Sequence, residues 1–491
     1  MTPVQRSIFF SAVERYASLA LFFAATAVLS RLLTPAEFGI YAVVNALTAV
    51  IMATFQEFGG GNYLIQKHGL SRDSVRTAFT VTFAISALVG VVLFALSGPL
   101  SRLFSQDGLR AGIAISSLNF LIAPFSGTLS ALYRRKLEFG TLAICNFASI
   151  AASSAVAIAL ALLHFSYLAP IWGNVAGSVV LAGMLLLFCR DIALFRPSLA
   201  EYRDVIGFGL YSSGVGLINV FYNLSPQLFM ARILDFAAVG LYSRAVALTQ
   251  VFDKMVVQVL NPVIMPAIVA RRTAGDELRS VYLQSLQFLA AVQWPALIFV
   301  ALMAQPIILI WLGHNWLEIV PLVRLLCVAN MALFAACLSY PVLVAVGNVR
   351  DALISSLISL PPSLLLILGA SFLSVDAVAA SALLTLPFQA AVAFHFIGRR
   401  LQVSFADVAR ALVKSAVATA VTAAGVAASA ALVEVGVIGP IAGLVCAIFA
   451  AAFCWLAGLA MTSHPLLPEL RHAARGLAVV VPQFRRWRSA Q

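Results

Sequence analysis

Residues 31–48 read RLLTPAEFGIYAVVNALT, and residues 232–249 read RILDFAAVGLYSRAVALT. The two stretches align without gaps at an offset of 201, and eight of the eighteen aligned pairs are identical. Self-similarity at a fixed offset is typical of a duplicated architecture. The sequence therefore predicts two related halves, each carrying one copy, with Gly39 and Gly240 at matched positions that permit close contact between helices.

The composition places both halves in a membrane. Of the 491 residues, 62% are hydrophobic and only 10% are charged, and the mean hydropathy is +1.00. Soluble domains carry about 25% charged residues. Crossing roughly 30 Å of hydrocarbon takes about 20 residues of apolar helix, and the apolar runs of this chain have that length. We therefore predict an all-α integral membrane protein.

Fourteen apolar runs, separated by polar breaks, predict about fourteen transmembrane helices. They lie near residues 7–29, 39–58, 75–98, 110–132, 138–163, 166–189, 206–229, 237–264, 280–303, 321–346, 351–373, 376–397, 411–434 and 437–461. The predicted domains are an N-terminal six-helix lobe (1–200), a C-terminal six-helix lobe (201–400), two further helices (401–462) and a tail (463–491). Because Glu14 and Arg15 interrupt the first run, we expect a permanent helix there and not a cleaved signal peptide.

The distribution of basic residues predicts the orientation. With the N-terminus in the cytoplasm, 22 of the 31 Lys and Arg residues fall in cytoplasmic segments and four fall in outer loops. Because cytoplasmic loops are enriched in Lys and Arg, we expect an inner-membrane protein with both termini cytoplasmic. The two copies then face the same way, as in transporters whose parallel repeats rock about a midplane site. The same loops explain the net charge of +12, so nucleic-acid binding is not expected.

The sequence carries no motif for catalysis, metal binding or a cofactor. The six cysteines lie in or at the ends of apolar runs without a C-x-x-C pair, which predicts small buried hydrophobic residues. A phosphate-binding G-x-x-x-x-G-K-[ST] loop is absent, so direct coupling to ATP is not expected. The outer loops are short, which leaves no domain on that side to hold a polymer.

Polar side chains inside the predicted helices mark a candidate path, because such groups are costly in hydrocarbon unless they face water or a partner. The predicted substrate-binding or cavity residues are Arg15, Asn45, Gln56, Asn219, Asn223, Gln250, Lys254 and Arg324. The predicted residues for ion coupling or charge balance are Glu14, Glu57 and Asp253. The cations suit a diphosphate, since their donors reach several oxygens at once. The alternative is that the pairs Glu14–Arg15 and Asp253–Lys254 lie at the headgroup boundary.

Several motifs resemble one family. They are VERY at 13–16, SRLLTPAEFGIY at 30–41, QEFG at 56–59, YRRK at 133–136 and YSRAVAL at 242–248. This set is similar to the Wzx-like polysaccharide transporters, which are flippases of lipid-linked oligosaccharides in the MOP exporter superfamily. The resemblance implies two six-helix lobes plus two C-terminal helices, and flipping of an undecaprenyl-diphosphate-linked repeat unit by alternating access. It further implies membrane lipids, a polysaccharide polymerase or co-polymerase and an H⁺ or Na⁺ gradient as partners.

Other functions stay open at this point. Within the same superfamily they are a MATE-type drug or cation antiporter and a lipid II flippase. A membrane polysaccharide polymerase or acyltransferase belongs to a different class, and the short outer loops count against it. The cluster Arg134, Arg135 and Lys136 is expected to contact anionic lipid, with capture of a diphosphate substrate as the alternative.

Overall fold

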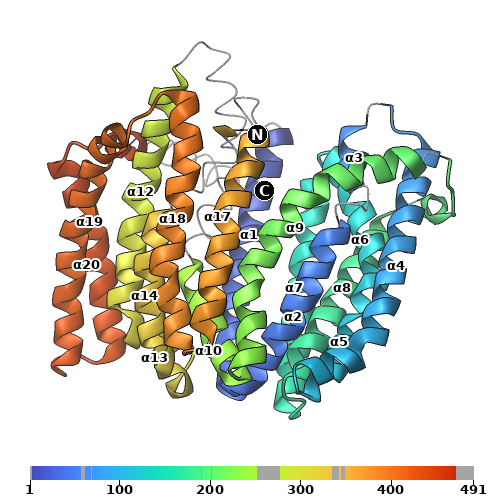
Figure 1. The fold of residues 1–491 in the computed structure, drawn as a ribbon, viewed down its shortest axis with the longest axis horizontal. Coiled ribbons are helices and arrows are strands. Elements are labelled where there is room, and N and C mark those ends of the chain that lie inside the picture. Colours follow the sequence, from blue (N-terminus) through green and yellow to red (C-terminus); the bar gives the residue numbers. More distant parts are fainter. Residues whose placement is uncertain are drawn as a thin grey trace, which may run out of the picture. The chain divides into compact units, whose positions relative to one another are not determined.

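The computed structural model describes residues 3–56, 61–67, 69–189, 191–200, 202–251, 277–333, 342–343 and 349–471. Within these ranges every regular element is a helix (Figure 1). The predicted all-α class is therefore confirmed.

The first of two compact units comprises residues 1–245, 311–319 and 363–378. Its helices are α1 (Pro3–Leu32), α2 (Pro35–Gln56), α3 (Gly61–Gln66), α4 (Arg72–Leu103), α5 (Gly108–Ser116), α6 (Leu118–Arg135), α7 (Phe139–Leu162), α8 (Leu168–Phe188), η1 (Ile192–Phe195), α9 (Tyr202–Ile233), the start of α10 (Phe236–Thr249) and η3 (His314–Ile319). Small residues bring α7 and α8 together: a Cβ atom added to Gly173 would lie 2.7 Å from the Ser153 carbonyl oxygen. Close approach at small residues is how helices associate in a membrane.

The second unit comprises residues 246–310, 320–362 and 379–491. Its described helices are α12 (Leu278–Leu302), α13 (Ala304–Trp311), α14 (Val320–Asn330), η4 (Met331–Leu333), the first part of α17 (Val349–Ser371), most of α18 (Val375–Leu401), α19 (Phe405–Glu434) and α20 (Pro440–Met461). Helix α19 packs between α12 and α20 (Figure 1). The Trp455 indole N–H of α20 donates to the Ala291 carbonyl of α12 at 2.7 Å, which ties α20 to α12 as well.

One buried histidine lies just beyond α20. His464 is 1% exposed, its Nδ1 accepts from the Leu466 N–H at 3.1 Å, and its Nε2 lies 3.1 Å from the Ser415 hydroxyl. That hydroxyl is 3.0 Å from the Gln287 carbonyl oxygen. Burial, with Lys414 as a smaller cause, lowers the pKa of His464 to about 4. The ring is therefore neutral at physiological pH and fastens the end of α20 to α19.

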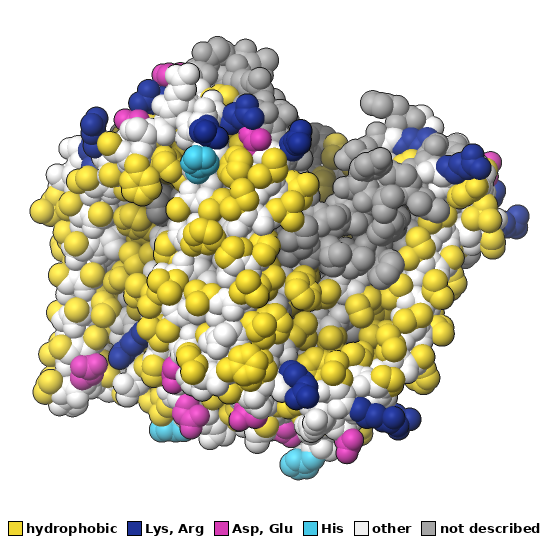
Figure 2. Space-filling view, in the orientation of Figure 1, with side chains coloured by type: hydrophobic (Ala, Val, Ile, Leu, Met, Phe, Trp, Pro, Cys, Tyr) yellow, Lys and Arg dark blue, Asp and Glu magenta, His cyan; other side chains and the backbone are white. Residues whose placement is uncertain are grey.

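Twelve of the described helices are long and apolar enough to cross a membrane, and each coincides with a predicted run. Of the two remaining predicted runs, that near 206–229 lies within the 32-residue helix α9. The run near 237–264 begins with α10, and its remainder lies largely outside the described residues. Hydrophobic side chains cover the middle of the helices in Figure 2, while charged side chains gather towards the helix ends.

Two details differ from the sequence-based expectations. The predicted run near 110–132 is divided into α5 and α6 at Ser117, whose hydroxyl donates to the Ala114 carbonyl at 2.7 Å; such back-bonding bends helices. The cysteines are not uniformly buried: Cys145 and Cys327 are buried, but Cys446 is exposed. The reason is that Cys446 lies on the outer face of α20, where a small apolar side chain suits contact with lipid.

Candidate functional site

The two copies of the repeat fold alike at their helix starts. At α2, the Thr34 N–H donates to the Glu37 carboxylate at 2.7 Å, and the Glu37 N–H is 3.3 Å from the Thr34 hydroxyl. This is a capping box, in which each side chain satisfies the other residue's backbone. At α10 the residue matched to Thr34 is Asp235, and its carboxylate accepts from the Ala238 N–H at 2.7 Å. The repeat therefore encodes two capped helices.

These two helices cross at the matched glycines. A Cβ atom on Gly39 would overlap the carbonyl oxygen of Phe236, and one on Gly240 would overlap the carbonyl oxygen of Pro35. Phe236 is the repeat counterpart of Pro35, so the contact is reciprocal, as at a local two-fold axis. The prediction that both glycines permit close helix contact is confirmed. We call this contact the glycine crossing.

Aromatic side chains and one cation surround the glycine crossing. The Trp316 indole N–H donates to the Ser30 carbonyl at 2.7 Å, and the Trp316 ring contacts Phe38 edge to face. The guanidinium carbon of Arg244 lies 4.1 Å from the centroid of the Phe38 ring, a cation–π geometry. The Arg244 Nε is buried and has no hydrogen-bond partner.

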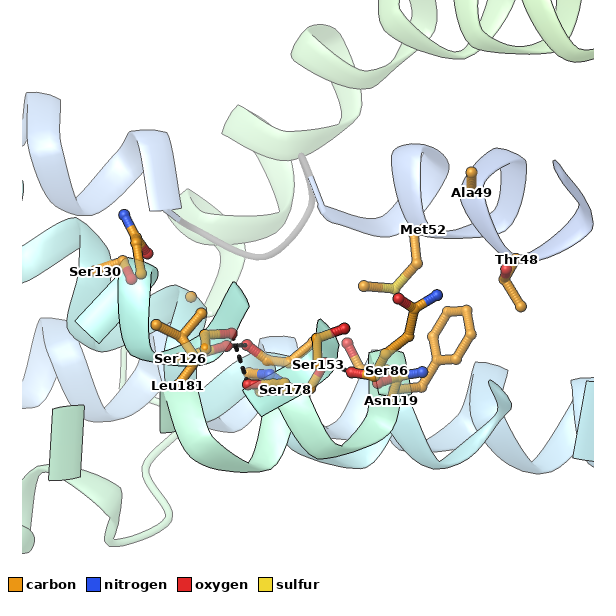
Figure 3. A pocket seen from close by; sticks show the side chains of 18 of the residues that line it. Thr48, Ala49, Met52, Ser86, Asn119, Ser126, Ser130, Ser153, Ser178 and Leu181 are labelled. Atoms are coloured by element: carbon orange, nitrogen blue, oxygen red, sulfur yellow. Dashed lines mark hydrogen bonds between the residues drawn. The ribbon is translucent and has the colours of Figure 1, made fainter. Parts of the chain in front are cut away.

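A cavity of about 970 Å³ opens inside the first unit, among α2, α4, α6, α7 and α8. Neutral polar side chains line much of it: Asn45, Thr48, Thr82, Ser86, Ser116, Asn119, Ser126, Thr128, Ser130, Asn146, Ser149, Ser153, Ser154, Asn174 and Ser178. Figure 3 shows Thr48, Ala49 and Met52 of α2 on one side, with Asn119 and Ser153 across from them. Among the described lining residues Arg134 carries the one formal charge, and none is Asp or Glu.

Five hydroxyl groups of this lining, those of Thr48, Thr82, Ser126, Ser149 and Ser178, donate to backbone carbonyls. Thr82 donates to the Ala78 carbonyl at 2.6 Å, and Thr48 donates to the Val44 carbonyl at 2.7 Å. Ser149 reaches across to the Gly177 carbonyl of α8, also at 2.7 Å. A Ser or Thr hydroxyl has one donor and two acceptor sites. When the donor is used by the backbone, acceptor lone pairs are what it can offer to the cavity.

Two lining residues have buried acceptors with no partner. They are the Asn119 Oδ1 and the Thr128 Oγ1, and Thr128 is only 3% exposed. A buried polar atom without a hydrogen bond is costly, by about 1–3 kcal/mol. Both atoms are inaccessible from the cavity in this structure, so they are unpaired polar groups of the packed wall behind it.

The basic cluster at the end of α6 is divided between two roles. Arg135 donates to the carbonyl oxygens of Leu64 and Lys67, at 2.7 and 2.8 Å, and so holds the end of α3. Arg134 instead lines the cavity, and Lys136 is exposed.

The structure brings one predicted site residue, Asn45, into the cavity. In α1 the predicted residue Glu14 accepts a hydrogen bond from the Ser18 hydroxyl at 3.2 Å, and the predicted residue Arg15 is half-buried beside it. Three further predicted residues are exposed elsewhere: Asn223 on α9, Gln250 after α10 and Arg324 on α14. Outside the described residues lie Glu57, Asp253 and Lys254, and the side chains of Gln56 and Asn219.

The sequence analysis predicted Asn45 of this lining but missed its hydroxyl groups and its other three amides, because it weighed polar side chains in other predicted helices. A weaker signal was present in the spacing of polar residues along single helices. Asn146, Ser149 and Ser153 follow i, i+3, i+7 in α7, and Asn174 and Ser178 follow i, i+4 in α8. Such spacing places them on one helix face.

Fold and site together define an all-helical membrane protein with a duplicated helix motif and an interior polar cavity. The chain belongs to the family of polysaccharide biosynthesis proteins, whose family model matches residues 28–321, more than half of the chain.

Individual relatives are more distant. The chain is 24% identical over 310 residues to the lipopolysaccharide biosynthesis protein WzxC of Escherichia coli, covering 62% of each chain. It is 24% identical over 359 residues to the succinoglycan biosynthesis transport protein ExoT of Rhizobium meliloti, covering 71% of this chain and 72% of that one. The matches thus span about two thirds of these relatives' length. The solved structure of the lipid II flippase MurJ, in an inward closed conformation, superimposes with a TM-score of 0.72 at 12% identity, covering 94% of this chain and 99% of MurJ.

Proposed function

We propose that this protein moves a lipid-linked oligosaccharide across the bacterial inner membrane for the synthesis of a surface polysaccharide. Membership of the polysaccharide biosynthesis family supports this function, as do the relatives WzxC and ExoT. The single observation that carries it is the cavity of about 970 Å³, lined by many uncharged polar side chains, inside a unit of membrane-spanning helices. A sugar head group loses its hydrogen bonds with water on entering a membrane, and a polar wall replaces them.

The glycine crossing supplies a closure for one end of the path. Contact of α2 with α10 at Gly39 and Gly240 holds that end shut, and separation of the two helices opens it. In the predicted topology this end faces away from the cytoplasm. Alternation between closure here and closure at the opposite end is the proposed route of transport.

The charged residues predicted from the sequence belong to this proposal as partners of the diphosphate. Arg15, Lys254 and Arg324 supply positive charge, while Glu14, Glu57 and Asp253 balance it or accept a coupling proton. An H⁺ or Na⁺ gradient and a polysaccharide polymerase are the proposed external partners. The distribution of Lys and Arg supports the further proposal that both termini lie in the cytoplasm.

The alternatives fit the cavity less well. A cation antiporter needs a carboxylate to compensate its substrate inside the membrane, and no Asp or Glu is found among the described residues of the lining. For a polymerase or acyltransferase, the short predicted outer loops offer no place to hold a growing polymer.

Deleting the gene in its native host tests the function. We expect lipid-linked repeat units to accumulate in the cytoplasmic leaflet, where a membrane-impermeant reagent cannot modify them, and surface polysaccharide to disappear. Accumulation of single repeat units on the outer face would instead indicate a lost polymerase. Unchanged polysaccharide with altered drug sensitivity would indicate an antiporter.

A further inference from the structure

A nine-residue segment from the second half of the sequence belongs to the first unit. Residues 311–319 are part of that unit, although the chain on either side of them, 246–310 and 320–362, belongs to the second unit. The segment contains the last residue of α13 and all of η3. It is therefore a covalent link through which a rearrangement of the second unit can pull directly on the first.

Two tryptophans fasten this segment to α1. The Trp311 indole N–H donates to the Phe23 carbonyl at 2.9 Å, and the Trp316 indole N–H donates to the Ser30 carbonyl at 2.7 Å. The rings of Trp311 and Phe23 also meet edge to face, with centroids 5.4 Å apart. Between the two tryptophans the chain passes through Gly313, whose φ of +101° suits a residue without a side chain. The segment is therefore attached to α1 at two points that are about two helical turns apart.

Trp316 also fixes the position of Phe38 at the glycine crossing. Both side chains are buried, with exposed fractions of 0% for Trp316 and 2% for Phe38. Their rings meet edge to face with centroids 5.4 Å apart, an arrangement that aromatic pairs prefer. Because Phe38 directly precedes Gly39, the segment contacts α2 where α2 meets α10 most closely.

Arg244 of α10 depends on the same ring. Its guanidinium carbon lies 4.1 Å from the centroid of Phe38, and its Nε is buried without a hydrogen-bond partner. Among the described residues no carboxylate forms an ion pair with Arg244. A buried cation is costly without a partner, and an aromatic face is such a partner where water is excluded. The closed crossing therefore needs the Phe38 ring in place.

We propose that residues 311–319 form a latch on the glycine crossing, in which Trp316 is a positioning residue for transport. Trp316 holds the Phe38 ring, and the ring stabilises the Arg244 cation while α2 and α10 are in contact. Withdrawal of the segment releases the ring, leaves the cation without its partner and favours separation of α2 from α10. The role in transport rests on the proposed function, whereas the latch itself rests only on the contacts described above.

The test measures opening of the crossing in the purified full chain in lipid vesicles. Spin labels are attached to cysteines at Ala36, in the first turn of α2, and at Arg232, at the end of α9, after the six native cysteines have been replaced. Both positions are exposed. Pulsed electron resonance then gives the populations with a short and with a long distance between the labels.

The variant Trp316→Phe keeps an aromatic ring and removes the N–H group that bonds to the Ser30 carbonyl. The matched control is Trp455→Phe, because the Trp455 indole also donates to a backbone carbonyl, that of Ala291, at 2.7 Å, but within the second unit. We expect Trp316→Phe to raise the ratio of long to short distances about tenfold, which corresponds to about 1.4 kcal/mol. Trp455→Phe should match the wild type.

A second background separates positioning from general loosening. Arg244→Met removes the buried charge and keeps a long apolar side chain. In that background Trp316→Phe should change the ratio of distances less than about twofold, because the Phe38 ring no longer has a cation to stabilise, and such non-additivity is the mark of coupled residues. A Trp316 that merely stabilised the fold would give the same change in both backgrounds.

Flipping of a polyprenyl-diphosphate oligosaccharide, followed in the same vesicles with a membrane-impermeant oxidant, keeps the two proposals apart. Trp316→Phe should flip the substrate more slowly than Trp455→Phe. If the wild type flips nothing, the proposed function is wrong, and the distances alone decide on the latch. If Trp316→Phe keeps the wild-type distances, or changes them equally with and without Arg244, the latch is wrong. An opened crossing with undiminished flipping would show that Trp316 has no positioning role in transport.

Discussion

Replacing Gly39 with alanine adds a methyl group where α2 and α10 are in closest contact at the glycine crossing. The added Cβ overlaps the Phe236 carbonyl oxygen, a backbone atom that cannot rotate away. Forcing extra volume into a packed contact typically costs about 1–3 kcal/mol. We expect a cost near the upper end of this range, because the added atom overlaps backbone. A change of about 3 kcal/mol alters the equilibrium between closed and open crossing more than 100-fold. Gly240→Ala should do the same, because the contact is reciprocal.

Spin labels at Arg31 and Arg232 report the opening directly. These matched positions are both exposed, and cysteines can be introduced there after replacement of the six native ones. Pulsed electron resonance should give a short distance in the parent protein and a longer one in Gly39→Ala. Gly183→Ala is the control, because a Cβ there meets no atom within 4 Å and alanine favours a helix by up to about 1 kcal/mol.

Transport should fall with the change in distance, since a path that cannot close at one end cannot alternate. If Gly39→Ala retains the short distance and transports as well as Gly183→Ala, the glycine crossing has no role in closure. A longer distance with undiminished transport would leave the crossing as a contact without a role in closure.

Two further predictions concern stability. The pKa of His464 is lowered from 6.5 to about 4, so the unfolded chain binds more protons between these values, and stability present above pH 6.5 is lost as the pH falls towards 4. In detergent, the free energy of unfolding should be about 2 kcal/mol lower at pH 5 than at pH 8. The His464→Gln variant should not show this decrease. An equal decrease in both proteins would contradict the role of His464. Arg135→Ala should make the end of α3 more accessible to protease, because it removes the hydrogen bonds to the Leu64 and Lys67 carbonyls. Arg134→Ala should leave cleavage unchanged. Equal cleavage of both variants would show that Arg135 does not hold the end of α3.

The sequence predicted the membrane fold well, for a simple physical reason. A helix in hydrocarbon must satisfy its backbone N–H and C=O groups with its own hydrogen bonds, and it must present about 20 apolar residues to the lipid. Helices such as α4 and α20 are therefore visible in the sequence as long apolar runs. The glycine crossing was also predictable, because duplication repeated the small residue at Gly39 and Gly240. The break at Ser117 was not, since it depends on a single hydroxyl bonding back to Ala114.

The cavity could not be predicted from polarity alone. Ser149 lines the cavity, while Ser415 in α19 lies 3.0 Å from the Gln287 carbonyl oxygen within a packed interface. Both are serines within apolar helices. Which of them faces a cavity is decided by the approach of neighbouring helices, as at Gly173 against Ser153. That is tertiary information.

We propose that this chain alone carries a saccharide on a lipid through the bilayer. Its most direct test is to reconstitute the purified protein as the sole protein in sealed vesicles that hold a polyprenyl-diphosphate oligosaccharide in both leaflets. An impermeant oxidant added outside should then consume nearly all of the saccharide, because the inner pool is continually brought out. Consumption that stops at the outer-leaflet fraction, as in protein-free vesicles, would show that the chain does not move the saccharide.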